Sequence, residues 1–268
     1  MIRHPIPRPA ALALAVASIL VLIISYTVLS ERQHRLNPGD TTLPTWSQLR
    51  EGVGVAVHKN QRTGERWLVE DAKASLGRLF LGLLWGVAGA LILGLLMGCF
   101  SPAEAFLQPP FSLLAQIPPT AVLAVFFVLA GTGDNMYVAM IAFGVMPTLA
   151  MTVHMAVKEF PEELQFKAYT LGASHAEVIL AIIFHQILPR LLDAFRLAIG
   201  PAMVYLIAAE MVVGDVGFGY RIRLQSKLLN MSVVYPYLAC LAAFGFAMDG
   251  ALRQAQRRFC PWYQGSRG

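Results

Sequence analysis

Residues 158–189 read KEFPEELQFKAYTLGASHAEVILAIIFHQILP, a charged, helix-forming stretch between two long apolar runs. Its centre, residues 168–174, carries small residues where the flanking runs carry large ones. This pattern predicts a short polar helix with a small-residue turn, a shape that suits insertion into a groove on another protein. We therefore expect the chain to be one part of a larger assembly.

The composition places this stretch in a membrane protein. Of the 268 residues, 56% are hydrophobic and only 14% are charged, whereas soluble domains carry about 25% charged residues. A helix needs about 20 mostly apolar residues to cross a bilayer. The candidate runs are 10–29, 79–100, 111–129, 136–157, 191–213 and 233–248. The expected fold class is an all-α membrane protein with about six transmembrane helices.

These runs divide the chain into four expected segments. Residues 1–30 hold a first transmembrane helix, which we expect to be retained because no small-x-small cleavage site follows it. Residues 31–74 form the one sizeable polar region; within it, Thr45 and Gln48 fit a capping box that begins a short amphipathic helix. Residues 75–252 form a five-helix core. Residues 253–268 form a tail whose arginines favour the cytoplasmic side.

Two features inside the apolar runs are candidates for a transport path. The third run contains Gln116 followed by Pro118 and Pro119, and adjacent prolines leave carbonyl groups without intrahelical donors. Such breaks persist where protein or a water-lined cavity satisfies the backbone, so a packing kink and a path-lining break both remain open. Glu210 is the clearest ionisable residue within a run. We expect it to anchor the glycine-rich bend at 214–219 or to contact a solute.

The glycine-rich bend superficially resembles a dinucleotide fingerprint, but no strand–turn–helix unit surrounds it, so that interpretation is rejected. A partly re-entrant connection is expected instead. The basic residues that follow it are expected to face water: Arg221, Arg223 and Lys227. Earlier in the chain, Asp193 and Arg196 lie one helical turn apart and predict a local ion pair, with Arg190 as a further partner.

The sequence contains no pattern that predicts catalysis or a metal site. GxSxG, HExxH and Cys/His metal spacings are all missing, and the three cysteines read as packing residues. The GxxxxGK[ST] phosphate loop is missing too, so nucleotide-driven transport requires another subunit. The net charge of +5 is scattered among loops, which favours lipid headgroups over nucleic acid as the partner.

Residues 167–189 resemble the EAA loop of permease subunits in bacterial ATP-binding-cassette (ABC) importers. That loop reads EAA, three residues, Gly, nine residues, Ile, one residue and Leu-Pro, and the matching positions here are Ala168, Gly172 and Ile182. Phe166 and Lys167 replace the first Glu-Ala, and a Leu-Pro pair follows four residues later than in the family pattern. Over residues 70–263 the chain looks like the nitrate, taurine, sulfonate and bicarbonate branch of that family.

The resemblance implies the type I importer permease fold in a bacterial inner membrane. It implies a homodimer of this chain, two ATPase subunits that bind ATP and magnesium, and a periplasmic protein that delivers a small polar nitrogen- or sulfur-containing solute. Residues 158–189 are then cytoplasmic coupling helices, and residues 31–74 are periplasmic. This chain itself is expected to be no enzyme and to bind no cofactor.

The resemblance also assigns the residues expected to couple the chain to the ATPase, which are Ala168, Leu171, Gly172, Ala173 and Ser174. The proline break and the charge within an apolar run give the residues expected along the translocation path, which are Gln116, Pro118, Pro119 and Glu210. The alternative function is a secondary transporter or channel that works without an ATPase, but the sequence shows neither inverted repeats nor several buried acids.

Overall fold

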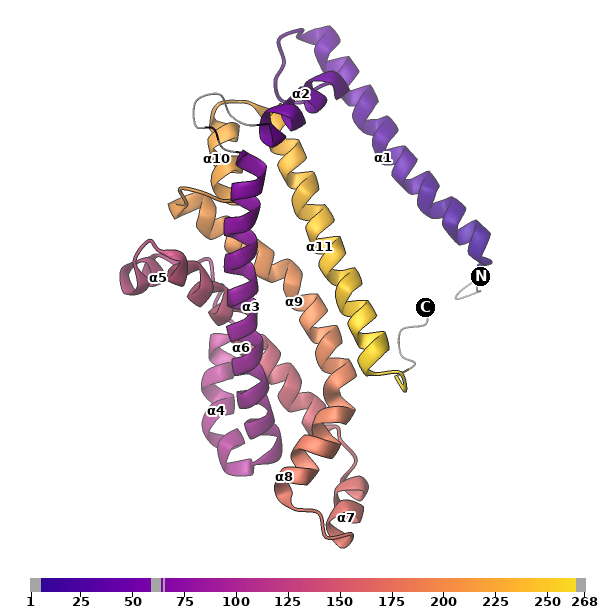
Figure 1. The fold of residues 1–268 in the computed structure, drawn as a ribbon, viewed down its shortest axis with the longest axis vertical. Helices are drawn as coiled ribbons and strands as arrows, with labels where there is room; N and C mark the ends of the chain where they lie inside the picture. The colour runs from indigo at the N-terminus through magenta and orange to yellow at the C-terminus, as the bar shows by residue number, and fades with distance from the viewer. Residues whose placement is uncertain (1–5, 59–63, 65, 264–268) are drawn as a thin grey trace. The chain divides into compact units, whose positions relative to one another are not determined.

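The computed structural model describes residues 6–58, 64 and 66–263, so the expected segments 1–30, 31–74 and 253–268 each fall partly outside the described residues. Within these ranges the chain is built of helices and turns without strands (Figure 1). It divides into two compact units. The first comprises residues up to 67 together with 224–238, and the second comprises 68–223 together with the residues from 239 onwards.

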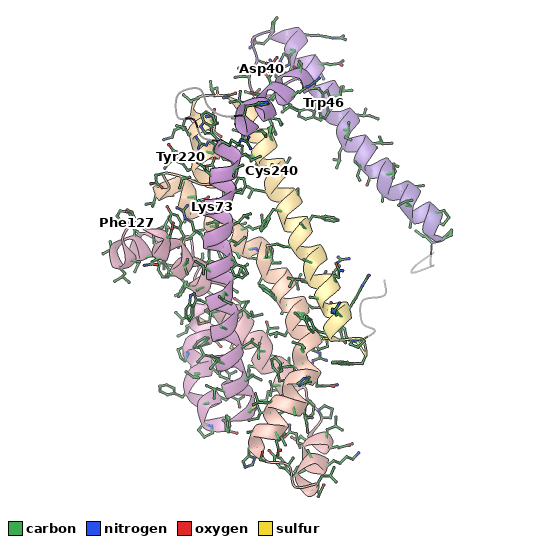
Figure 2. All side chains as sticks on the ribbon, viewed as in Figure 1. Asp40, Trp46, Lys73, Phe127, Tyr220 and Cys240 are labelled. Atoms are coloured by element: carbon green, nitrogen blue, oxygen red, sulfur yellow. The ribbon has the colours of Figure 1, made fainter. Side chains whose placement is uncertain are left out.

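In the first unit, the end of α1 (Arg8–Leu36) is tied to the beginning of α2 (Trp46–Val57). The predicted capping box is present, since the Gln48 N–H donates to Thr45 Oγ1 and the Thr45 N–H donates to Gln48 Oε1. The Trp46 indole donates to Thr27 Oγ1 at 3.1 Å, and the Tyr26 hydroxyl donates to the Pro44 carbonyl at 2.7 Å. Figure 2 labels Trp46 beside this connection. The predicted short helix is confirmed and belongs to an ordered connector.

In the second unit, α3 (Trp67–Cys99) packs closely against α6 (Asp134–Lys158) through a row of glycines. A Cβ added at any of five glycines would lie only 2.5–3.3 Å from the nearest atom of α6: Gly82, Gly86, Gly89, Gly94 and Gly98. Small residues at this spacing let two membrane helices approach, because dispersion between helices replaces the missing hydrophobic driving force. The row therefore sets the separation of α3 and α6.

Replacing Gly94 by valine should lower the free energy of unfolding by about 2 kcal/mol, because the added side chain would overlap Val153 and the Ala150 carbonyl. The measurement is the unfolding temperature of the purified chain in detergent. Gly77→Val is the matched control on the same helix, since a Cβ at Gly77 meets nothing within 4 Å. Equal unfolding temperatures for the two variants would contradict the packing role.

The expected helix over 111–129 is not continuous in the structure. The chain forms α4 (Ser101–Leu114) and then the eight-residue α5 (Leu123–Ala130), with turns between them. Pro118 and Pro119 supply no N–H to the residues one turn earlier, which favours a break here, although α4 continues through Pro109 and Pro110. The prediction of a single third helix is wrong, and the described residues contain five helices long and apolar enough to cross a membrane.

The broken passage still connects opposite ends of α6. At one end, the Lys158 ammonium lies 2.6 Å from Glu104 on α4 and lowers the pKa of that carboxyl below its usual value. At the other end, Asp134 pairs with Arg78 of α3. The residues between Glu104 and Asp134 therefore extend from one end of α6 to the other, although no single helix spans that distance. Figure 2 shows Phe127 among the apolar side chains of α5.

The remaining elements follow α6 along the chain. They are α7 (Glu162–Thr170), α8 (His175–Glu177), the π-helix η1 (Val178–Ile183), α9 (Phe184–Val213), α10 (Phe218–Lys227) and α11 (Met231–Phe259). Arg196 of α9 bonds Asp249 of α11 at 2.8 Å, and the predicted Asp193–Arg196 pair is confirmed at 3.0 Å. Arg190 does not join that pair, because it bonds Glu159 at the end of α6 instead.

Candidate functional site

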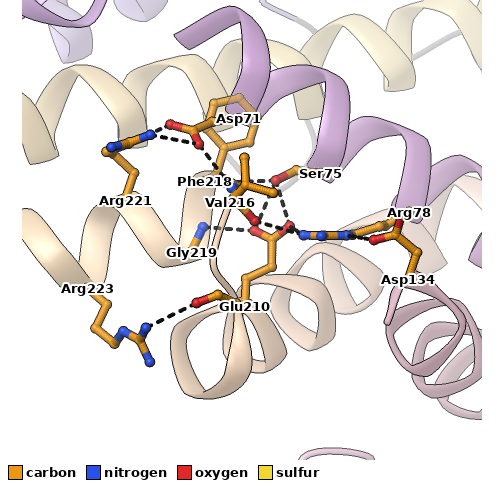
Figure 3. A network of polar contacts seen from close by, with 12 residues as sticks. Asp71, Ser75, Arg78, Asp134, Glu210, Val216, Phe218, Gly219, Arg221 and Arg223 are labelled. Atoms are coloured by element: carbon orange, nitrogen blue, oxygen red, sulfur yellow. Dashed lines mark hydrogen bonds and ion pairs between the residues drawn. The ribbon is translucent and has the colours of Figure 1, made fainter. Parts of the chain in front are cut away.

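The first backbone N–H groups of α10 are bonded by side chains from α3 and α9 (Figure 3). The Gly217 N–H donates to Asp71 at 3.0 Å, the Phe218 N–H to Ser75 at 2.9 Å, and the Gly219 N–H to Glu210 at 2.9 Å. A helix leaves its first N–H groups without intrahelical partners, and an apolar environment offers no water to pair them. Three side chains supply that pairing here, and two of them are acids, which the helix dipole favours at this end.

Arg78 connects this cap to α6. Its guanidinium donates to Glu210 Oε1 at 3.0 Å, to the Val216 carbonyl at 2.8 Å and to Asp134 Oδ1 at 2.6 Å. The guanidinium carbon also lies 4.2 Å from the centroid of the Tyr137 ring. Glu210 is 0% exposed, so its charge depends on these partners. We call Asp71, Ser75, Arg78, Asp134 and Glu210 the outer network.

The glycines of the bend are required by the close approach of this network. Gly217 has φ +125°, a conformation that side chains rarely adopt, and a Cβ there would touch the Glu210 carboxylate. A Cβ at Gly219 would lie 2.5 Å from the Ile207 carbonyl oxygen. Glycine thus lets the backbone reach the carboxylate directly, and the sequence feature that superficially resembles a nucleotide-binding loop has this structural cause.

Sequence reasoning located part of this arrangement. The predicted contact between Glu210 and the bend is present. The expectation that Arg221 faces water is wrong, because its side chain is 11% exposed and bonds Asp71 at 2.8 Å. Arg223 is partly exposed and donates to the carbonyls of Val212 and Gly214. Lys227 is exposed, as expected. Both arginines are held by acceptors that the bend and α3 expose.

Asp71, Ser75 and Arg78 were missed because they precede the second expected membrane helix, 79–100, as an apparently polar flank. Their spacing of four and three residues puts them on one face of α3, from which they reach the bend and Glu210. A polar stripe at i, i+4 and i+7 that runs into an apolar stretch was the available signal. Read in that way, the sequence indicates a buried polar contact at the helix start.

Replacing Arg78 by methionine should lower the free energy of unfolding by about 3 kcal/mol or more, because Glu210 is left buried without its counter-charge. Adding Glu210→Met should restore part of this loss, since the uncompensated charge is then gone. The unfolding temperature in detergent measures both. Arg223→Met serves as the control because Arg223 bonds two carbonyls and lies 5.6 Å from the centroid of the Tyr220 ring, with no ion pair to a described acid. A double variant less stable than the single one would refute the pairing.

At the opposite end of α6, the turn between α7 and α8 has a defined backbone geometry. Gly172 has φ +86°, the Gly172 N–H donates to the Tyr169 carbonyl, and the Ala173 N–H donates to the Ala168 carbonyl. These bonds form a Schellman motif, in which a glycine in the left-handed region ends a helix. Ser174 then begins the next helix with a capping box to Glu177. One helix therefore stops and the next begins within four residues.

The base of this turn is buried, and its tip is exposed. Ala168 packs with Phe160, Val178 and Ile183 in a cluster that continues into α6 and α9. Leu171, in contrast, is 88% exposed. The Tyr169 hydroxyl bonds His175 Nδ1 at 2.9 Å across the turn. We call residues 162–177 the exposed turn; it is a rigid projection that presents an apolar side chain outward.

The structure corrects the packing role that the small residues suggest. A Cβ at Gly172 would meet nothing within 4 Å, so this glycine is needed for its backbone conformation and not for close contact within the chain. Among the path candidates, Gln116 and Pro118 are exposed, and Pro119 is buried. Pro119 lies near Gly144 of α6, where an added Cβ would lie 2.8 Å from its ring. Figure 1 shows α7 and α8 beyond the ends of α6 and α9.

This arrangement of side chains suits binding and movement better than catalysis. In the part of the chain that the structure describes, no three His, Cys, Asp or Glu side chains are grouped to hold a metal ion. The buried acids of the outer network are fully engaged with arginines and backbone N–H groups. Long apolar helices with a broken passage and an exposed turn at one end define a polytopic membrane protein.

Comparison with known proteins identifies the family of this membrane protein. The family described as "Binding-protein-dependent transport system inner membrane component" matches residues 86–259, and the chain belongs to this family. It is therefore a permease component of a binding-protein-dependent ABC importer, as the sequence of the exposed turn predicted. Residues 168–174 and Glu210 both lie inside the matched range.

Individual relatives agree with this assignment. The taurine transport system permease protein of Escherichia coli (strain K12) is 27% identical over 97% of this chain and 93% of its own length. The putative aliphatic sulfonates transport permease protein of Bacillus subtilis (strain 168) is 26% identical over 70% of this chain and 68% of its own length. An inward facing structure of the MetNI methionine ABC transporter has a TM-score of 0.65 at 21% identity, covering 72% of this chain and 96% of that one, and shows a shared fold.

Proposed function

We propose that this chain couples ATP hydrolysis in a partner subunit to solute import, and that the exposed turn is the coupling element. The residues that carry this role are Ala168, Leu171, Gly172, Ala173 and Ser174. In the complete importer, two copies of the chain form the path in a bacterial inner membrane. Two ATPase subunits bind ATP and magnesium on the cytoplasmic side, and a periplasmic binding protein delivers the solute.

The observation that carries this proposal is the contrast between the base and the tip of the turn. Ala168 is 7% exposed and packed into the bundle, whereas Leu171, three residues later, is 88% exposed. Leaving a leucine in water loses about 1.5–3 kcal/mol relative to burying it, so this side chain favours a partner with an apolar groove. The packed base then transmits the partner's movement to α6 and α9.

The solute path is proposed to pass the break at Gln116, Pro118 and Pro119, where the exposed backbone requires polar or watery surroundings. Glu210 is proposed to shape the outer end of that path by holding the bend, since its carboxylate is fully used by Ser75, Arg78 and Gly219. The relatives named for taurine and aliphatic sulfonates support a small organic solute of the nitrogen- or sulfur-containing class.

Replacing Leu171 by aspartate should weaken ATPase binding by about tenfold or more, because the charge would have to enter an apolar groove. The unfolding temperature should not change, since the side chain is exposed. Pull-down of the ATPase with the detergent-solubilised permease measures the affinity. Leu228→Asp, at another exposed leucine, is the control. Unchanged ATPase retention by the Leu171 variant would rule out docking through this tip.

Substitution of Gly172 is a second test, which separates the effect of backbone conformation from the effect of side-chain volume. Valine strongly disfavours the left-handed region, whereas asparagine adopts it with little strain. We expect Gly172→Val to abolish most ATP-driven uptake in proteoliposomes and Gly172→Asn to retain most of it, although both enlarge the side chain into open space. Loss of uptake in both variants would mean that the partner needs the missing side chain and not the turn geometry.

A further inference from the structure

A cavity of about 270 Å³ lies between the middle of α6 and the middle of α9. Its wall includes Gly144, Thr148, Leu197, Pro201 and Tyr205, and both helices are long enough to cross a membrane. The space suits a molecule of only a few heavy atoms. Nothing in the proposed coupling role uses this cavity, so its chemistry is a separate question.

The cavity wall carries hydrogen-bonding groups that the protein does not satisfy. Pro201 has no N–H, so the carbonyl of Leu197, one turn earlier, loses its helical donor at a position where both residues line the cavity. Neither the Thr148 hydroxyl nor the Tyr205 hydroxyl bonds any residue that the structure describes. Free polar groups at membrane depth persist where water or a polar molecule pairs them.

The same wall carries no charge. Its residues are Gly144, Val145, Thr148, Leu149, Thr152, Ala194, Leu197, Ala198, Pro201 and Tyr205, none of which is ionised at neutral pH. An ion in this cavity would lose hydration without gaining a counter-charge, which is costly at membrane depth. A neutral molecule with N–H or O–H donors would instead bond the freed carbonyl and both hydroxyls.

Tyr205 and Pro119 both lie close to Gly144 of the cavity wall. A Cβ at Gly144 would lie 2.5 Å from the Tyr205 ring and 2.8 Å from Pro119, so both side chains converge on this glycine. Pro119 is buried there, so the break that precedes α5 lies beside the cavity wall.

We propose that the α6–α9 cavity is a binding position on the translocation path for a small uncharged solute that donates hydrogen bonds, such as an amide or a urea-like molecule. This inference rests on the proposed import function and restricts its solute class to uncharged molecules, which differ from the charged solutes for which the taurine and sulfonate relatives are named. Thr148, Tyr205 and the Leu197 carbonyl supply the polar contacts, and the apolar remainder of the wall excludes ions.

The first test is thiol labelling of Leu197→Cys in a full-length chain whose three native cysteines are replaced by alanine. Leu197 is 79% exposed, and Phe246→Cys on α11, where Phe246 is 82% exposed, is the matched control. The probes are hydroxyethyl, ammonioethyl and sulfonatoethyl methanethiosulfonate, which share a size and differ in charge. Each rate in proteoliposomes is divided by the rate of the same reagent with mercaptoethanol.

The neutral reagent is expected to modify Leu197→Cys at least about tenfold faster than either charged reagent, because the wall offers no counter-charge. It is also expected to react there faster than at Phe246→Cys. Equal rates for the three reagents, or a rate no higher than at Phe246, would overturn the proposal, the latter because lipid then fills the cavity. The labelling needs neither ATP nor an ATPase, so a failure of the coupling role leaves this result unaffected.

The second test measures binding. Acetamide should slow the labelling of Leu197→Cys, whereas methylammonium and methanesulfonate at the same concentration should not. In a Tyr205→Phe background the half-protecting concentration of acetamide should rise about tenfold, the effect of one lost hydrogen bond. Absence of acetamide protection, or protection unchanged by Tyr205→Phe, would show that the hydroxyl-bearing wall does not bind the solute.

Discussion

Backbone groups cannot remain unpaired in hydrocarbon, and this constraint governs each place where the chain leaves the α-helix. At the start of α10, Asp71, Ser75 and Glu210 take the place of the missing carbonyl acceptors. At the end of α7, the Schellman motif around Gly172 pairs the last carbonyls. At Pro201, the lost N–H leaves the Leu197 carbonyl without its helical donor, and a cavity lies there.

The two ends of the bundle are stabilised by different means. The outer network holds α3, α6, α9 and α10 together through buried charges and hydrogen bonds. The other end uses an apolar cluster around Phe160, Val178 and Ile187, with ion pairs only at its edge. Polar networks have demanding geometry, whereas apolar contacts allow small sliding movements. The end that carries the exposed turn is therefore the one better suited to movement.

The sequence predicted the membrane class, the exposed turn and the capping box at Thr45, because each depends on a local pattern: apolar length, glycine with a cap, or Thr-x-x-Gln. It also identified Glu210 as a residue that needs a partner. The partners themselves could not be read from it, since Arg78 and Ser75 are separated from Glu210 by 132 and 135 residues. The prediction of a continuous third helix failed for a physical reason. Hydropathy measures how apolar the residues are, and it takes no account of the backbone N–H groups that Pro118 and Pro119 lack.

The helix that begins at α8 and ends with α9 runs 39 residues from His175 to Val213, and it is not uniform. It contains the π-helical segment η1 and two internal prolines, Pro189 and Pro201, and such positions are where long helices bend. Its far end is fastened to α3 through Glu210. In the coupling role proposed for the exposed turn, a movement of α8 would bend this helix at η1 and at the two prolines, while its far end stays attached to α3. The cavity lined by Pro201 lies at the last of these positions before that attachment.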